Sequence, residues 1–424
     1  MIESEAIQAE EPAIALGGRE QLFHLLAEAS EVEHTLMCSY LYAAFSLDAR
    51  AAEKLNVRDA AVVSSWYKAI LAVATEEMTH LLLVANLTIA IGGRPHFGRP
   101  NFPVAPGYFP SGVVVRLQGF SLETLDHFIY LERPRGVEHK DGEGFEPEAH
   151  YERTEAYTDL MPSLQDYRTV GHLYDAIREN LKATAQRLGE AALFIGPVEG
   201  QIDKKTVRLE GVLTVCDLAS ALRIIDVIVE QGEGSATGNE QSHYQRFLAI
   251  RSQYEDLLER SPDFSPAFPV ATNPVMRLPP EPDDKVFIDD PAAARVLDFA
   301  NGVYGLILRL LVHGFGREGG DGRAATQRNL ASAIGLMHVL DRAGRALAAM
   351  PARSDDLTIH AGLTFTMLRS VNPMFVRQAE DEVIAERLGE AVASARVAAR
   401  TNPALSSLPA SVEEIAAAFA KTDV

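Results

Sequence analysis

One long segment, residues 59–91, constrains the fold of this chain more than any other. It reads as a single helix that ends at the glycines and proline of residues 92–95. Its apolar residues, such as those at 81–84, occupy more than one face, and such a helix is expected inside a bundle rather than on a surface. The same helix carries Glu77 and His80, which a spacing of three residues places on one face. An acid and an imidazole in an apolar helix need polar partners, and a metal ion would supply them.

Helical periodicity recurs along the chain, so the fold class is expected to be mainly all-α. Ser121 and Asp217 are suitable N-caps for two of the predicted helices. Alternating apolar and polar residues at 195–216 predict a small β-hairpin instead. The helices are predicted at residues 20–50, 59–91, 121–131, 170–194, 217–231, 240–260, 291–314, 323–350, 379–400 and 411–421.

Proline-rich and acidic stretches divide these helices into two groups. The chain is long enough, at 424 residues, for two or three domains. The expected organisation is a disordered acidic tail at 1–18, a metal-binding four-helix bundle at 19–260 with insertions at 93–165 and 195–216, a Pro-rich linker at 261–290 and a C-terminal helical bundle at 291–424.

Composition excludes several classes of protein. A formal net charge of −20 disfavours binding to nucleic acid or to anionic lipid. The two cysteines, Cys38 and Cys216, lie in apolar surroundings, which indicates a reduced, cytoplasmic protein rather than a disulfide scaffold. The first residues lack the basic and apolar regions of a signal peptide. No run of about 18 uncharged apolar residues is present, so no membrane span is expected.

Acids and histidines recur on four of the predicted helices in an informative order. Glu33 lies on the first helix, Glu77 and His80 on the second, and a second Glu-x-x-His on the fourth, at Glu240 and His243. This is the ligand order of ferritin-like di-metal carboxylate bundles. Carboxylates can bridge two ions, and imidazole nitrogen suits iron or manganese. The alternative is that Glu77 and His80 form a buried hydrogen-bonded pair and that Glu240 and His243 simply begin a helix. The third helix offers further candidates at His172, Asp175 and Glu179.

Several stretches also resemble the ferritin-like domain of the iminophenylpyruvate dimer synthase family. They are LLAEASEVEHTLMCSYLYAAFSL, ATEEMTHLLLVANLTIAIGG, TVGHLYDAI and IVEQGEG with SHYQRF. The later AGLTFTMLRSVNP is similar to that family's C-terminal region. Members of that family act in bisindole pigment pathways, where they couple two indole imine units to a chromopyrrolate-type product. The resemblance covers about residues 20–260 and implies a ferritin-like bundle.

Carried over by position, the resemblance implies a specific ligand set. Its members are Glu33, Glu77, His80, the helix-three position, Glu230 and His243. This chain has His172 where the family often has an acid, so that either the second metal is not bound or it gains an extra nitrogen ligand. The fourth helix is broken after Glu230, so Glu230, Glu233 and Glu240 compete as the partner of His243. Glu230 is preferred because it continues an apolar helical face.

Together these features predict a ferritin-like di-metal oxidoreductase with two iron or manganese ions. We expect a small organic substrate, an amino-acid-derived imine by the resemblance, and dioxygen or peroxide as oxidant. The alternatives are a metal-binding or storage protein and a degenerate helical scaffold without catalysis. No nucleotide cofactor is expected, because the G-x-G-x-x-G match at 314–319 follows a helix rather than a strand. A homodimer is compatible with the sequence but not required by it.

Overall fold

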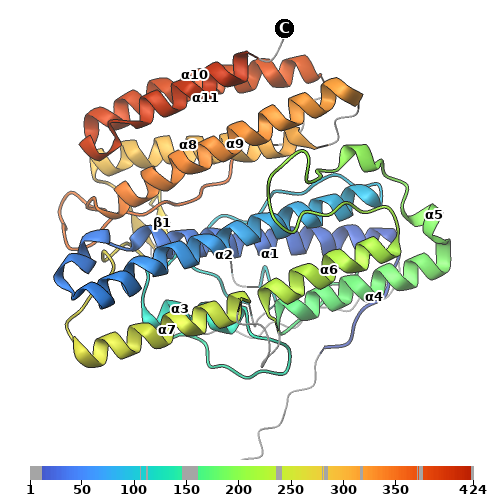
Figure 1. Ribbon diagram of the computed structural model, residues 1–424, viewed down its shortest axis with the longest axis horizontal. Helices are drawn as coiled ribbons and strands as arrows, with labels where there is room; N and C mark the ends of the chain where they lie inside the picture. The colour runs from blue at the N-terminus through green and yellow to red at the C-terminus, as the bar shows by residue number, and fades with distance from the viewer. Residues whose placement is uncertain are drawn as a thin grey trace, which may run out of the picture.

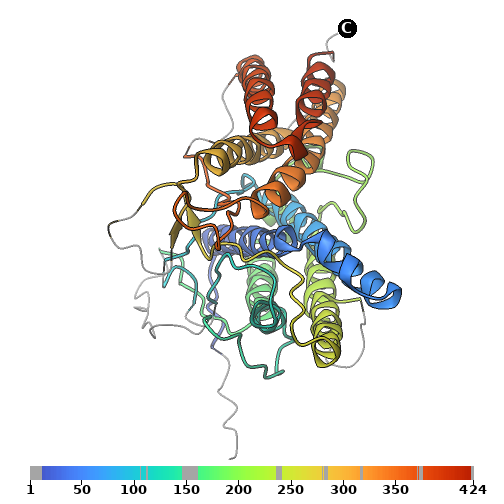
Figure 2. The same ribbon diagram turned by 90° about the vertical axis from the view of Figure 1, so that its left-hand side faces the viewer.

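The computed structural model is built almost entirely of helices, arranged in layers (Figure 1). It describes residues 12–105, 107–110, 113–145, 161–234, 241–278, 280, 285–315, 319–369, 371 and 376–421. The expected all-α class is therefore confirmed. Figure 2 shows the same layers after a quarter turn.

Two long helices, α1 (Arg19–Ser46) and α2 (Val57–Ala90), pack against each other at the centre. On one side of this pair lie four shorter helices, and on the other side lie the helices of the C-terminal half (Figure 1). The shorter helices are α3 (Leu122–Leu131), α4 (Val170–Leu188), α6 (Leu218–Gly232) and α7 (His243–Arg260). The C-terminal helices are α8 (Pro291–Gly314), α9 (Gly319–Ala348), α10 (Arg377–Thr401) and α11 (Leu408–Ala420).

The third and fourth positions of the N-terminal bundle are each filled by two helices placed end to end (Figure 1). One position holds α3 and α4, and the other holds α6 and α7, with α2 contacting both α6 and α7. Side-chain caps begin the new helices, because the first N–H groups of a helix have no partner within it. Ser121 and Asp217 act as the predicted N-caps, and Thr169 and Ser242 cap α4 and α7.

Two local predictions need correction. No β-hairpin forms at 195–216, all of which the structure describes; the segment has one short 3-10 helix, η2 (Val198–Gly200). Its apolar residues, Val207 and Val212 among them, are instead buried against the helices. The helix predicted at 170–194 is divided at Gly189, whose φ of 83° ends α4 before the short α5 (Glu190–Leu193).

Described residues of the proline-rich segment 261–290 form hydrogen bonds with the end of α1. The backbone N–H of Asp48 donates to Pro266 O at 2.8 Å, and the N–H of Phe268 donates to Ser46 O at 2.8 Å. The segment also contributes the short parallel pair β1 (Pro274–Val275) and β2 (Val286–Phe287). It is therefore attached to the end of α1. Similarly, residues 12–18 of the predicted tail lie along the fold, where the N–H of Gly17 donates to Asn180 Oδ1 at 2.8 Å; residues 1–11 lie outside the described part.

The two halves share one hydrophobic core. Buried residues of α1 and α2 belong to the same cluster as those of α8 and α9. At Gly344 on α9, an added Cβ would lie only 2.3 Å from Phe45 Cδ2 on α1, so glycine is what allows the helices to approach here.

Two further 3-10 helices lie next to α-helices: η1 (Ala49–Lys54) follows α1, and η3 (Pro403–Leu405) precedes α11.

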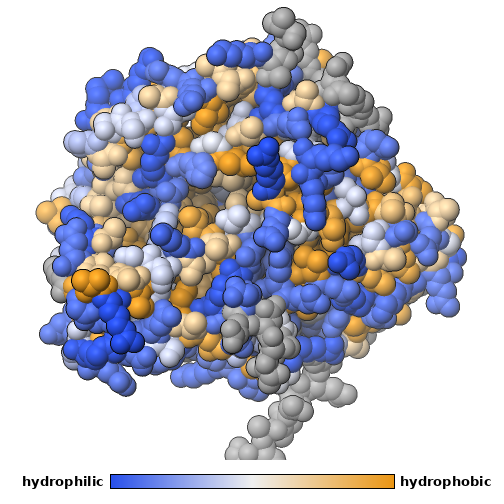
Figure 3. Space-filling view, viewed as in Figure 1, coloured by the Kyte–Doolittle hydropathy of each residue, from blue (hydrophilic) through white to orange (hydrophobic). Residues whose placement is uncertain are grey.

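Two helices, α2 and α8, are long and apolar enough to cross a membrane by length and composition. In α2, 72% of the most apolar window is buried in the fold, and in α8 the share is 78%. Burial of this kind is typical of core helices. Hydrophilic residues cover much of the face seen in Figure 3, with hydrophobic residues between them.

Candidate metal centre

A buried group of two acids and one histidine joins α1 to α2. His80 Nδ1 lies 3.1 Å from Glu77 Oε2 and 3.3 Å from Glu33 Oε2. All three side chains are at most 3% exposed. One ligand atom from each lies within 4.8 Å of the others, close enough to bind a single metal ion.

A second group lies beside the first and shares Glu77 with it. His243 Nδ1 lies 2.9 Å from Glu77 Oε1 and 3.4 Å from Glu132 Oε1. Glu77, Glu132 and His243 again meet within 4.8 Å. The rings of His80 and His243 are stacked, with centroids 5.4 Å apart. Glu77 thus turns one carboxylate oxygen toward each histidine, the position of a bridging ligand.

The donor set fits a pair of metal cations. Three carboxylates, those of Glu33, Glu77 and Glu132, are buried together, which is costly unless positive charge compensates them. His243 Nδ1 lies 2.9 Å from Glu77 Oε1, but the two groups are not oriented for a hydrogen bond. This buried nitrogen is therefore available to a metal ion. Mixed carboxylate and imidazole ligation suits iron, manganese or zinc. The residues present therefore fit a two-metal centre.

Protonation in the metal-free site reflects the same crowding of charge. Burial, followed by the charge of Glu77, raises the pKa of Glu33 to about 7. Burial alone would lower the pKa of His80, but the charge of Glu77 and hydrogen bonds to the two acids raise it to about 10. The pKa of His243 is also raised, because Glu77 and Glu132 outweigh the effect of its burial.

Outer contacts hold the ligands in orientation. His80 Nε2–H donates to Gln231 Oε1 at 3.0 Å, and His243 Nε2–H donates to Glu76 Oε2 at 2.9 Å. Both contacts leave Nδ1 for the metal, and partners of this kind fix the tautomer of a ligating histidine. The hydroxyl of Tyr174 donates to Glu33, and that of Tyr40 donates to Glu132 Oε1 at 2.5 Å.

The breaks in the bundle helices lie at the level of this centre. Glu132 is the C-cap of α3, and His243 is the first residue of α7. Glu233, the C-cap of α6, is buried and accepts a hydrogen bond from the N–H of Gly171 at 2.6 Å. A Cβ at Gly171 would lie 2.3 Å from the Glu233 carboxylate, so a larger residue here would displace that carboxylate. Burial raises the pKa of Glu233 to about 7 despite its hydrogen bonds.

The structure brings together four of the six main predicted ligands: Glu33, Glu77, His80 and His243. It does not bring Glu230 to them, because the Glu230 side chain is exposed on α6. His172 is buried near the start of α4, where its N–H is capped by Thr169, and belongs to neither metal-binding group.

The weaker candidates have other positions. Asp175 pairs with Arg135 and Arg178, and Glu179 pairs with Lys182. Glu240 lies outside the described residues.

Sequence reasoning missed Glu132. It lies one residue beyond the end of α3 and before a polar segment, so it reads as the start of a loop. A usable signal was present, because Leu125 and Phe128 share its helical face and both are buried. That inward face, extended by one turn, ends in Glu132.

A small cavity of about 20 Å³ borders the centre. Its lining includes Glu33, Glu77, His80, Glu132 and Glu233. One water-sized molecule fills such a space, and a drug-sized organic molecule does not enter it.

Comparison with known proteins agrees with this geometry. A buried cluster of carboxylates and histidines within a bundle of long helices is typical of carboxylate-bridged metal-binding proteins. The profile of the family described as "Ferritin-like" matches residues 26–252, more than half of the chain, and the chain belongs to this family.

Two curated relatives confirm the resemblance found in the sequence. One is named dichlorochromopyrrolate synthase, from Lentzea aerocolonigenes; it is 28% identical in an alignment of 335 residues that covers 70% of this chain and 31% of the relative. The other is named 2-imino-3-(indol-3-yl)propanoate dimerase, from Chromobacterium violaceum; it is 28% identical in an alignment of 328 residues that covers 73% of this chain and 30% of the relative. The chain thus spans about a third of their length.

A solved structure is also similar. It is the crystal structure of a ferritin-like protein from Caulobacter vibrioides, with a TM-score of 0.39 and 20% identity. The match covers 67% of this chain and 82% of that protein.

Proposed function

We propose that this chain is a di-metal oxidoreductase that binds two iron or manganese ions and acts with dioxygen or peroxide on a small organic substrate. The observation that carries the proposal is Glu77, whose two oxygens face two different histidines. One group is completed by Glu33 and the other by Glu132. A single carboxylate shared in this way is what a bridged metal pair requires.

The proposed ligands are Glu33, Glu77, His80, Glu132 and His243. When bound, two such metal ions supply electrons to a small oxidant and stabilise the negative charge that forms on it. The cavity of about 20 Å³ favours an oxidant of a few atoms at this position. The buried side chains of Leu36 and Ile228, which border it, limit access of water.

Glu233 is the group best placed to hold a proton beside the cavity. Its carboxyl group accepts hydrogen bonds from the N–H groups of Gly171 and Arg135, which fix its position. Because burial raises its pKa to about 7, a substantial fraction is protonated near neutral pH. The carboxyl O–H can therefore donate a proton to a reduced oxidant in the cavity, which is general acid chemistry.

The substrate class rests on the relatives rather than on the geometry. One relative's name specifies a 2-imino-3-(indol-3-yl)propanoate, so an amino-acid-derived imine is the first substrate to test. A cytoplasmic location agrees with the sparse cysteines.

The test is dioxygen consumption by protein loaded anaerobically with Fe(II). We expect uptake that depends on Glu77 and that continues catalytically when an aromatic 2-imino acid is formed in the solution by condensation of its 2-oxo acid with ammonium, a reaction that consumes no dioxygen. Glu123→Ala is a matched control, since Glu123 is exposed on α3. Uptake that stops once the bound iron is oxidised, with no organic product, would instead identify a metal-storage activity.

A further inference from the structure

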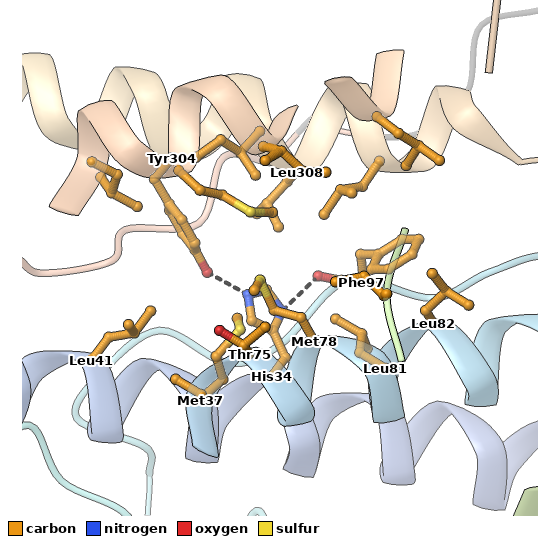
Figure 4. Close-up of a pocket in the computed structure, with 18 of the residues that line it drawn as sticks. His34, Met37, Leu41, Thr75, Met78, Leu81, Leu82, Phe97, Tyr304 and Leu308 are labelled. Carbon is orange, nitrogen blue, oxygen red and sulfur yellow. Dashed lines mark hydrogen bonds between the residues drawn. The ribbon is translucent and has the colours of Figure 1, made fainter. Parts of the chain in front are cut away.

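A large apolar pocket lies between α1–α2 and α8–α9 (Figure 4). Its volume is about 380 Å³, within the range of roughly 300–1,000 Å³ found for ligand sites. The helices α8 and α9 lie on the side of α1–α2 away from α4 and α6, whereas the metal-binding group faces α4 and α6 (Figure 1). The pocket and the metal centre are thus separate spaces.

The C-terminal half of the chain creates this pocket. Met37, Leu41 and Met78 of the central helices line one side, and Tyr304 and Leu308 of α8 line the other (Figure 4). The residues of α8 and α9 lie outside the region matched by the ferritin-like family. The pocket is therefore a property of the additional helices and not of the bundle alone.

Polar side chains in the interior are paired with one another. The hydroxyl of Tyr304 donates to His34 Nε2 at 2.7 Å and accepts from Arg99 Nη2 at 3.0 Å. His34 Nδ1–H donates to Phe97 O at 3.1 Å, and Thr75 Oγ1 donates to Leu71 O at 2.8 Å. Because these side chains already form hydrogen bonds with one another or with the backbone, a polar group on a ligand would find no free partner at this end of the pocket. Its inner part must be apolar.

The lining favours an apolar body, because most of its side chains are aliphatic. Aromatic and methionine side chains contribute to it, and these adapt well to aromatic rings. They are Met37, Phe45, Met78, Phe97, Phe315, Met337 and Phe365.

The mouth of the pocket is polar. Of the lining residues, Arg208, Ile334 and His338 are exposed, so the pocket opens between the 202–209 segment and α9. The carboxylate of Asp341, also in the lining, accepts a hydrogen bond from Tyr67. Arg208 carries a permanent positive charge, and its planar group matches a carboxylate.

We infer that this pocket binds a small carboxylate with an apolar body, which lies among the apolar side chains while the carboxylate lies at Arg208. Binding is independent of the metal centre, because none of the lining residues belongs to either metal-binding group. The site is therefore a second one, distinct from the proposed metal chemistry.

The test uses 2-naphthylacetate and the uncharged 2-(naphthalen-2-yl)ethanol as probes, measured by isothermal titration calorimetry on the full chain. We expect one molecule of either probe to bind, the carboxylate about tenfold more tightly. Arg208→Gln should remove that difference and leave binding of the alcohol unchanged. Arg223→Gln, an exposed arginine on α6 outside the lining, should change neither.

A second variant tests the interior. Ile334→Trp adds volume at the exposed mouth and should weaken both probes, while the circular dichroism spectrum stays that of the parent. Repeating the titrations with Glu77→Ala separates this site from the metal centre, and we expect the same affinities. Absence of binding by both probes, or a preference for the carboxylate that survives Arg208→Gln, would overturn the inference.

Discussion

At the scale of residues, Glu132 is the side chain that completes the second metal-binding group. It lies 3.4 Å from His243 Nδ1 and receives a hydrogen bond from Tyr40. Without it, the second metal-binding group would retain only Glu77 and His243. The assignment of two metals rather than one therefore depends on this carboxylate.

We predict that Glu132→Ala lowers the metal content from about two ions per chain to about one. The remaining ion should be held by Glu33, Glu77 and His80, which do not depend on Glu132. Metal analysis by mass spectrometry after anaerobic loading measures this. Glu123→Ala on the same helix serves as the control, and a variant of Glu132 that still binds two ions would contradict its role as a ligand.

Protonation gives a second prediction for the same residues. In the metal-free protein, the raised pKa of His80, about 10, stabilises the fold fully below pH 6.5, and this contribution is lost as the pH rises toward 10. The raised pKa of Glu33, about 7, works in the same direction between pH 4.5 and 7. Metal binding requires these ligands to lose their protons, so affinity rises with pH.

The increase in melting temperature caused by Mn(II) should therefore grow as the pH rises through this range. Differential scanning calorimetry with and without Mn(II) measures it. An increase that shrinks at higher pH, before any metal hydroxide forms, would show that these groups are not the ligands.

Spacing within one helix made part of the site predictable. Glu77 and His80 share a face by their separation alone, and Glu33 and His243 lie within or beside other apolar stretches. The burial of Glu132 and Glu233 was harder to predict, because each lies at the end of a helix, where the chain changes direction and places the side chain inside the bundle. The exposure of Glu230 could not be predicted either, because the sequence of an apolar helical face does not show which other element covers that face.

At the scale of elements, the important feature is that the broken helices meet at the metal centre. The first N–H groups of α4 face the C-terminal end of α6, where the Glu233 carboxylate binds the N–H of Gly171. A negative charge is favourable at such a helix start. The break therefore supplies a fixed acid beside the cavity.

Substitution of Gly171 tests this arrangement. The added Cβ of Gly171→Ala would lie 2.3 Å from the Glu233 carboxylate, so we predict a loss of roughly 1–3 kcal/mol in the free energy of unfolding, typical of overpacking. In contrast, Gly389→Ala on α10 meets no atom within 4 Å and should stabilise by about 0.5–1 kcal/mol. Urea denaturation measures both. Equal effects at the two positions would contradict the close contact.

Element boundaries were predicted best where caps or proline mark them. Ser121 and Asp217 begin α3 and α6 as expected, and Pro291 begins α8. The supposed hairpin at 195–216 was wrong because its alternating apolar residues pack against helices, and the same period-two pattern serves either purpose.

At the scale of the whole molecule, the two groups of helices act as one body. The sequence predicted two bundles joined by a linker, and that division stays a prediction. However, α1 and α2 are buried on both sides, so the halves share a core. Pattern alone cannot tell whether a helix that is apolar on several faces is surrounded by one bundle or lies between two.

A shared core predicts a single cooperative unfolding transition. Trp66, the sole tryptophan of the sequence, is buried in the N-terminal bundle, so its fluorescence reports on that half. Far-ultraviolet circular dichroism reports on all helices. In urea, the two signals should have the same midpoint. Separate midpoints would show that the halves unfold independently.

The measurement that tests the central claim most directly is the metal content of the protein and of Glu77→Ala, after anaerobic loading with Fe(II) and removal of unbound metal. Because Glu77 belongs to both groups, we predict about two ions per chain in the parent and fewer than one in the variant. A parent protein that retains no iron, or a Glu77→Ala variant that retains two ions, would contradict the two-metal centre.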